Sequence, residues 1–387
     1  MPRFIAILIL AAASIFHFNA MRANAKTENS NQKLDAIFSP LVGANSPGFA
    51  VLIRKNGQTV FQRGYGVREF GKPAKIDAQT NFRLASCSKQ FTAMSIMLLV
   101  HDGKLRYDET LAEIFPDFPV YGKSITIRNL LNHTSGLLDY ENLMEAFEKQ
   151  NGKRWSDKNQ IQDSEVFDLL KHADKTEFAP GTKWSYSNSG YVMLGLVVAK
   201  ASGKSFPDFL KERIFSPLKM ERTLAFVKGK NQIANRAFGN SKINSEWTET
   251  DQSSTSATLG DGGIYSNVQD LAKWDAALAN HTLLSEAEMQ PALTPFKISG
   301  AAQIVLPDDA TNAMKNNPSV EYGFGWFLDP YQNHRRMWHY GDTQGFHTYI
   351  ARFLDDDLAI IVLCNRTDVS PETLALKVAD LFLQAAK

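Results

Sequence analysis

The residues best suited to covalent chemistry are Ser86 and Lys89, three positions apart at the start of a helical run that continues to His101. Residues three apart lie on the same face of a helix, so the amine of Lys89 can accept or relay the proton of the Ser86 hydroxyl. The run is apolar on nearly every face, which predicts a buried helix closed by Gly103. The dipole of this helix favours an anion at Ser86, and the pattern therefore indicates nucleophilic attack on a carbonyl group.

Two further motifs stand at predicted element boundaries. Tyr186-Ser187-Asn188 follows a Pro180-Gly181 turn and precedes a helix predicted from Ser189 to Ala201. His339-Tyr340-Gly341 lies on a strand predicted between Arg336 and Thr343. None of the three motifs is specific alone, because copies of their spacing occur at Ser30 to Lys33, Ser216 to Lys219, Tyr140, Tyr331 and His101 to Gly103.

Taken together and in this order, the motifs resemble those of the serine β-lactamases, DD-peptidases and related esterases. The resemblance extends from about Leu34 to Leu383. It also includes the segments Gly103-Lys104-Leu105, Ile125 to Arg128, Leu130 to Leu137, Phe178 to Gly181, Gly262 to Ser266 and Tyr322 to Trp326. It implies an α+β fold of the β-lactamase/transpeptidase type, in which an antiparallel sheet flanked by helices carries an inserted, mostly helical subdomain.

The resemblance also implies catalytic roles. Ser86 attacks a carbonyl to form an acyl-enzyme, and Lys89 with Tyr186 forms the base system that takes its proton. Which of the two is the base in the ground state stays open, because a tyrosine with an ordinary pKa near 10 needs a cationic neighbour to act at neutral pH. Lys89 would be that neighbour.

The remaining implied site residues bind the substrate. Main-chain N–H groups of Ser86 and Asp342 would form the oxyanion hole, and Asn188 would orient the amide on the acyl side. His339 and Gly341 would form the wall of the substrate site. His133, in contrast, is interpreted as part of a polar loop at the subdomain junction.

The residue His339 departs from the pattern of the β-lactamases, which usually carry lysine there, and Tyr340 replaces a small hydroxyl residue. A histidine is mostly neutral at pH 7 and holds a substrate carboxylate less well than lysine does. The hypothesis is therefore a DD-peptidase-like peptide or amide hydrolase acting on a small molecule or peptide, with a peptidoglycan stem peptide as one candidate. A carboxylesterase or weak β-lactamase is the alternative, and a non-catalytic penicillin- or peptidoglycan-binding protein is the alternative of another class.

The surrounding elements fit this fold. Alternating apolar residues around Asn56-Gly57 predict a hairpin over 49–65, and a second hairpin is predicted from 346–354 and 358–364. Apolar spacing predicts a helix over 371–386 and mostly helices over 105–293. The predicted partition is a sheet subdomain of about 33–104 and 294–387 and a helical subdomain of about 105–293, within one hydrolase domain of 26–387.

The N-terminus has the pattern of a signal peptide. Arg3 precedes an apolar run from Phe4 to Phe16, which is too short to span a bilayer, and Ala23-Asn24-Ala25 is a small-x-small cleavage site before Lys26. Residues 1–25 are therefore expected to be removed, which leaves no stable membrane span and places the protein in the periplasm or outside the cell. An uncleaved anchor is the alternative.

Charge and composition exclude several other classes. The 42 basic and 41 acidic residues are nearly balanced and form no basic cluster, so nucleic acid is not an expected partner. The scattered histidines lack the spacing of a metal site, and no phosphate-binding glycine loop is present, so neither a metal nor another cofactor is expected. Only two cysteines occur, Cys87 and Cys364, and a disulfide between them stays open.

Overall fold

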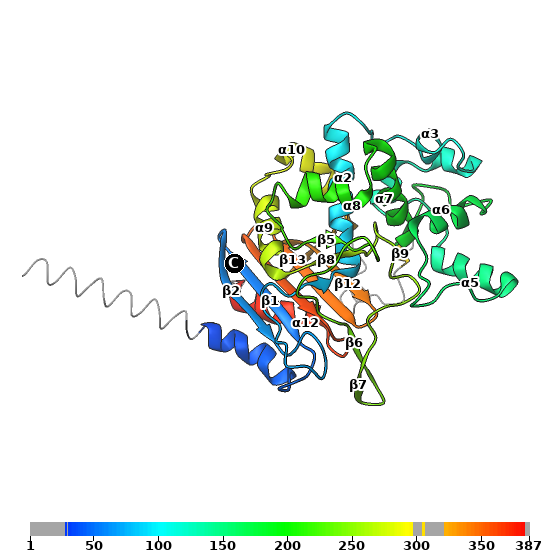
Figure 1. Ribbon diagram of the computed structural model, residues 1–387. Helices are drawn as coiled ribbons and strands as arrows, with labels where there is room; N and C mark the ends of the chain where they lie inside the picture. The colour runs from blue at the N-terminus through cyan, green and yellow to red at the C-terminus, as the bar shows by residue number, and fades with distance from the viewer. Residues whose placement is uncertain (1–27, 29, 297–303, 306–320, 384–387) are drawn as a thin grey trace, which may run out of the picture.

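A seven-stranded antiparallel sheet forms the centre of the molecule, as the computed structural model shows (Figure 1). The structure describes residues 28, 30–296, 304–305 and 321–383, so the predicted signal peptide lies outside it. Within this described part, no helix is both long and apolar enough to cross a bilayer. The strands run in the order β10 (Glu321–Tyr322), β11 (Phe327–Tyr331), β12 (His334–Thr343), β13 (Phe346–Phe353), β14 (Leu358–Cys364), β1 (Phe49–Lys55) and β2 (Gln58–Tyr65).

Both predicted hairpins are confirmed. Asn56 and Gly57 connect β1 to β2 with φ angles of 51° and 71°, the left-handed conformation that a tight hairpin turn requires. The second hairpin joins β13 to β14. β1 also pairs with β14, and Phe49 lies opposite Cys364. Strands from the N-terminal and C-terminal parts of the chain therefore belong to one sheet.

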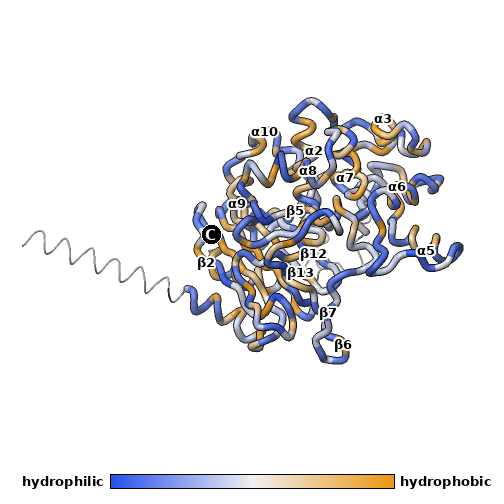
Figure 2. Tube along the Cα trace, viewed as in Figure 1, coloured by the Kyte–Doolittle hydropathy of each residue, from blue (hydrophilic) through white to orange (hydrophobic). Residues whose placement is uncertain are grey.

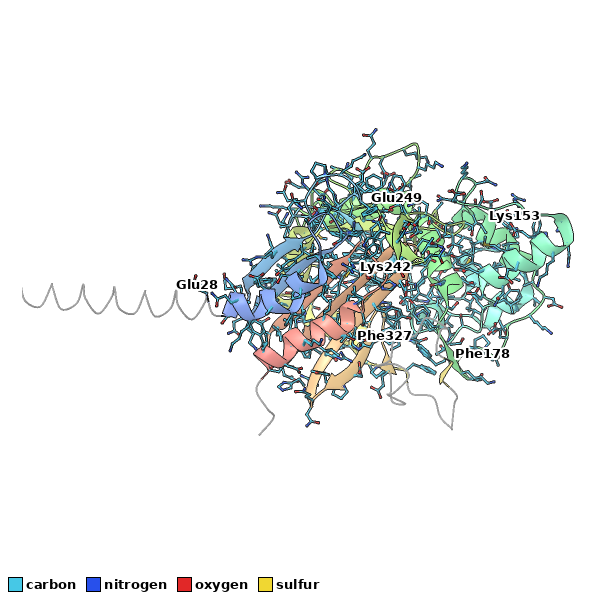
Figure 3. The ribbon with its side chains drawn as sticks, turned by 90° about the horizontal axis from the view of Figure 1, so that it is seen from below. Glu28, Lys153, Phe178, Lys242, Glu249 and Phe327 are labelled. Atoms are coloured by element: carbon cyan, nitrogen blue, oxygen red, sulfur yellow. The ribbon has the colours of Figure 1, made fainter. Side chains whose placement is uncertain are left out.

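The two faces of the sheet belong to different hydrophobic cores. On β1, Ala50 and Leu52 belong to a core shared with α2 (Lys89–His101) and α9 (Val268–Ala279). Phe49, Val51 and Ile53 belong to a second core with a helix over residues 30–38 and with α12 (Pro371–Phe382). Seen from below, this N-terminal helix and α12 cross the outer face of the sheet side by side (Figure 3).

The predicted helical region stands on the other face of the sheet, and hydrophobic residues gather where the two meet (Figure 2). Its further helices are α3 (Leu111–Ile114), α4 (Ile127–Leu131), α5 (Tyr140–Asn151), α6 (Asp163–Lys171), α7 (Asn188–Ser202), α8 (Phe206–Leu210) and α10 (Glu286–Met289), with a π-helical segment η4 (Lys211–Phe215) and 3-10 turns at Val120–Ser124 and Gln290–Leu293. Another 3-10 turn, Ser39–Leu41, follows the N-terminal helix.

Short strands interrupt the stretch that the sequence predicts as mostly helical. The strands β3 (Phe82–Arg83), β8 (Ile264–Ser266) and β5 (Leu224–Ala225) form a small sheet. A hairpin of β6 (Asn240–Ile243) and β7 (Glu246–Glu249) projects from the body, and β4 (Trp184–Ser185) pairs in parallel with β9 (Ile304–Val305). Strands of two to four residues are too short to show the alternation that reveals longer strands.

A buried ion cluster fixes α9 to the sheet. Asp275 of α9 accepts hydrogen bonds from Arg54 of β1 and Arg352 of β13, at 2.5 and 2.8 Å. All three residues are at most 8 % exposed, so the carboxylate is the counter-charge of two buried guanidinium groups. Elsewhere in the core, Cys87 and Cys364 are both free thiols, and the disulfide that the sequence left open does not form.

Candidate active site

Ser86 lies in a strained turn at the centre of the molecule. The turn η2 (Ala85–Ser88) is a 3-10 turn, so α2 begins at Lys89 and Ser86 stands just before the helix that it was predicted to open. Ala85 has a φ of 47°, a left-handed conformation that is costly for a residue with a Cβ atom and that often marks functional sites. Ser86 is partly exposed, whereas Ala85 and Cys87 are buried. The turn therefore presents the serine hydroxyl alone to solvent.

Lys89 is fully buried, and three oxygen atoms surround its amine. The Nζ atom lies 3.0 Å from Ser86 Oγ, 2.8 Å from Asn188 Oδ1 and 3.0 Å from the main-chain carbonyl oxygen of Asp261. An ammonium group has three N–H donors, and each of these oxygens can accept one of them. Lys89 is thus held against Ser86 by contacts on two other segments of the chain.

Tyr186 and Asn188 lie on the other side of this amine. Asn188 is the first residue of α7, and Ser187 caps that helix by accepting a hydrogen bond from the main-chain N–H of Gly190. The ring of Tyr186 is centred 4.9 Å from Lys89 Nζ, within the range of a cation–π contact. The structure therefore brings together four of the predicted residues, three of them by direct hydrogen bonds.

His339 is fully buried next to this group, and its ring is centred 6.2 Å from the ring of Tyr186. Its Nδ1 donates to the carbonyl oxygen of Tyr340 at 2.6 Å, so its Nε2 is an acceptor for the hydroxyl of Tyr322 at 3.0 Å. Burial, together with the charge of Lys89, lowers the pKa of His339 to about 3. The side chain is therefore uncharged, and both of its ring nitrogens take part in hydrogen bonds.

Gly341 is required where β12 meets the nucleophile turn. A Cβ atom at this position would lie 2.1 Å from the carbonyl oxygen of Leu84, 2.3 Å from Thr348 Oγ1 and 3.2 Å from Ala85 Cβ. Thr348 Oγ1 also donates to the Leu84 carbonyl at 2.9 Å. The absence of a side chain at Gly341 thus allows the Ser86 turn to rest directly on the strand.

Asp342 is exposed at the end of β12, and its carboxylate pairs with His347 of β13 at 3.0 Å. Burial lowers the pKa of His347, but Asp342 outweighs this effect and raises the pKa above its usual value. Within the described residues, the pairing of β11 with β12 ends at Trp338. Residues His339 to Thr343 of β12 therefore have no partner in β11. This stretch includes the main-chain N–H of Asp342, which was predicted to form part of the oxyanion hole.

Some residues of the site were not found from the sequence. Asp261 contributes a main-chain carbonyl, which any residue type could supply, so its side chain gave no signal. His133 was interpreted as a polar loop residue, but it is fully buried, and its ring is centred 4.3 Å from that of Tyr186. Tyr322 matched a family segment, yet its contact with His339 depends on the order in which β10, β11 and β12 lie in the sheet. No group of three histidine, cysteine or acidic residues within the described part could hold a metal ion.

A lysine at the start of α2 whose amine reaches a serine hydroxyl in the turn before it, beside an α+β sheet of this topology, is the arrangement of the serine hydrolases with a Ser-x-x-Lys motif. The chain belongs to the Beta-lactamase family, whose sequence model matches residues 34–383. It is 30% identical over 370 residues to Penicillin-binding protein 4* of Bacillus subtilis (strain 168), a match that covers 92% of this chain and 76% of that protein.

Two solved structures show the same fold. The first is the D-amino acid amidase of Ochrobactrum anthropi SV3, with a TM-score of 0.75, 23% identity and coverage of 91% of this chain and 99% of the other. The second is EstCE1, a hydrolase with promiscuous acyltransferase activity, with a TM-score of 0.74, 18% identity and coverage of 92% and 99%. The family model and the Bacillus subtilis relative confirm the predicted family. The two solved structures confirm the α+β fold.

Proposed function

We propose that this protein is an exported DD-peptidase-like hydrolase that cleaves a peptide or amide bond through an acyl-enzyme on Ser86. The hydrogen bonds of Lys89 to Ser86, Asn188 and Asp261 are the observation that carries the proposal. The names of the relatives agree with an amide substrate, because they include a penicillin-binding protein and a D-amino acid amidase.

The three partners of Lys89 suit both protonation states of its amine. A neutral amine has two N–H donors and one lone pair. The carbonyl oxygens of Asn188 and Asp261 only accept, so they take the two donors, and the lone pair then accepts the Ser86 hydroxyl proton. In the ammonium state the third N–H points back at Ser86 Oγ. A proton can therefore pass between Ser86 and Lys89 while the other two hydrogen bonds stay in place.

The reaction then follows as two acyl transfers. Ser86 Oγ forms a bond to the substrate carbonyl carbon and its proton passes to Lys89, with Tyr186 beside the amine to relay it. The main-chain N–H groups of Ser86 and Asp342 would stabilise the oxyanion. The carbon–nitrogen bond breaks as the proton reaches the leaving amine. Water next attacks the ester, its proton returns through the same groups to Ser86, and the carboxylic acid leaves.

The neutral His339 supports the choice of substrate. A lysine at this position would offer a permanent positive charge to a substrate carboxylate, whereas His339 is uncharged at neutral pH because of its lowered pKa. Tyr340 is buried in the core on the other face of the sheet, where its side chain is 6 % exposed. Efficient hydrolysis of β-lactams is therefore not expected. A carboxylesterase is the second candidate, since an ester needs no carboxylate contact and EstCE1 shares the fold.

The test is steady-state hydrolysis of three substrates by the wild type and by Ser86→Ala. The substrates are a D-alanyl-D-alanine peptide, a short-chain aryl ester and a chromogenic cephalosporin. Turnover of the peptide that Ser86→Ala abolishes supports the proposal, and preference for the ester moves the carboxylesterase ahead. If penicillin forms an adduct on Ser86 that is never released and nothing is turned over, a binding role replaces the enzyme. N-terminal sequencing of exported protein should begin near Lys26.

A further inference from the structure

His133 lies beside Tyr186 although the two residues are far apart in the sequence. It follows α4 and has a φ of 61°, a left-handed conformation that is rare for a histidine. Its carbonyl oxygen accepts the N–H of Ser185 at 2.9 Å, and its Nδ1 accepts the N–H of Ser187 at 3.0 Å. One residue thus holds the amide groups on both sides of Tyr186.

The ring of His133 also packs directly on the proposed catalytic phenol. The ring centroids of His133 and Tyr186 are 4.3 Å apart with an interplanar angle of 36°, and Tyr322 packs against His133 at 4.4 Å. Because Nδ1 accepts an amide proton, the neutral ring carries its own proton on Nε2. That nitrogen is buried and has no hydrogen-bond partner among the described residues. A buried N–H without a partner is costly, so packing alone does not explain a histidine here.

The surroundings keep this histidine uncharged. Burial and the positive charge of Lys89 lower the pKa of His133 well below its usual value, and His339 acts in the same direction. The rings of Tyr191 and Trp184 complete its environment, and neither carries a charge at neutral pH. A charged ring would lose the hydrogen bond that Nδ1 accepts from the Ser187 N–H, because a protonated nitrogen cannot accept.

We propose that His133 is a positioning residue for Tyr186, which it holds in place by accepting hydrogen bonds from both flanking amide groups and by packing against the phenol ring. This inference rests on the proposed acyl-enzyme chemistry of Ser86. The main-chain bond to Ser185 is independent of the side chain, whereas the bond to Ser187 needs an acceptor at the position of Nδ1. The identity of the residue at position 133 therefore controls the backbone on the Ser187 side of Tyr186.

Three variants separate the acceptor from the ring. His133→Asn places a carbonyl oxygen close to the position of Nδ1 and tolerates the left-handed backbone. His133→Phe keeps an aromatic ring but has no acceptor, and His133→Ala removes both. The control is His281→Phe, which changes an exposed histidine that follows α9 and also has a left-handed backbone, with a φ of 50°.

The first readout is the rate of single-turnover acylation of Ser86 by an aryl ester, with melting temperature to correct for unfolded protein. We expect a fall of about ten- to a hundredfold in His133→Phe and His133→Ala, the range for a buried N–H left without a partner. His133→Asn should stay within about threefold of the wild type, and substrate affinity should change little. Equal rates in His133→Phe and the wild type would overturn the proposal.

The second readout is hydrogen exchange at the Ser187 amide, which does not depend on turnover. Exchange should accelerate in His133→Phe and stay slow in His133→Asn and His281→Phe. Unchanged protection in His133→Phe overturns the proposed contact. Failure of the wild type to form an adduct refutes the chemistry at Ser86 instead, so the two failures are distinguishable.

Discussion

Replacement of Gly341 by alanine should separate the Ser86 turn from β12. The new Cβ atom would lie 2.1 Å from the Leu84 carbonyl oxygen, and non-bonded carbon and oxygen atoms need more than about 3 Å. The turn must therefore move by about 1 Å, a displacement that can reduce the rate by about a hundredfold. Overpacking of this kind also costs about 1–3 kcal/mol of stability.

The matched control for this variant is Gly262→Ala, which adds a methyl group near the same turn. Its Cβ would lie 3.7 Å from Ala85, an ordinary contact, so activity and stability should stay close to the wild type. Both variants should be assayed for single-turnover acylation and for thermal unfolding at equal concentration. Acylation by folded Gly341→Ala within threefold of the wild type would refute the conclusion that close contact with β12 positions Ser86.

Three further predictions concern charge. Asn188→Asp places a carboxylate 2.8 Å from the amine of Lys89 and favours the charged form of that amine. The acid limb of the pH–rate profile should therefore shift by about 1–3 units to higher pH. Asn188→Ala should not shift it to higher pH. The pKa of His339 is about 6.5 in the unfolded chain and about 3 in the folded protein. The free energy of unfolding should therefore fall with decreasing pH, by about 1.4 kcal/mol per pH unit between these values. Denaturant titrations at several pH values should show that this free energy depends less on pH in His339→Gln. Asp275→Ala leaves Arg54 buried without this counter-charge and leaves Arg352 with its pair to Asp357. The change should cost about 3–5 kcal/mol in urea unfolding, and a loss below 1 kcal/mol would contradict this account.

Local patterns revealed the parts of this fold whose signals lie within one stretch of sequence. The hairpin around Asn56-Gly57 was predictable because alternating apolar residues flank a dipeptide that adopts positive φ. The helix from Lys89 was predictable because apolar residues cover nearly all of its faces. The Ser-x-x-Lys motif gained meaning from its place before this helix.

Contacts between distant segments could not be predicted in the same way. The role of Asp261 depends on a main-chain carbonyl, and the contact of His133 with Ser187 joins residues that no local pattern relates. The strands β5 and β8 are recognised only by their pairing, since two or three residues show no periodicity. These features arise from tertiary packing.

The environment of Lys89 also makes the site a sensor of complete folding. Its three hydrogen-bond partners come from the turn before α2, the start of α7 and the segment before β8, which the chain must assemble before the amine is correctly placed. A fragment that contains only the Ser-x-x-Lys helix would lack two of these partners. The amount of Ser86 labelled by an acylating probe would therefore report the number of native molecules, not only the number of intact chains. The rate at which labelling appears during refolding would report how fast the helical region docks onto the sheet.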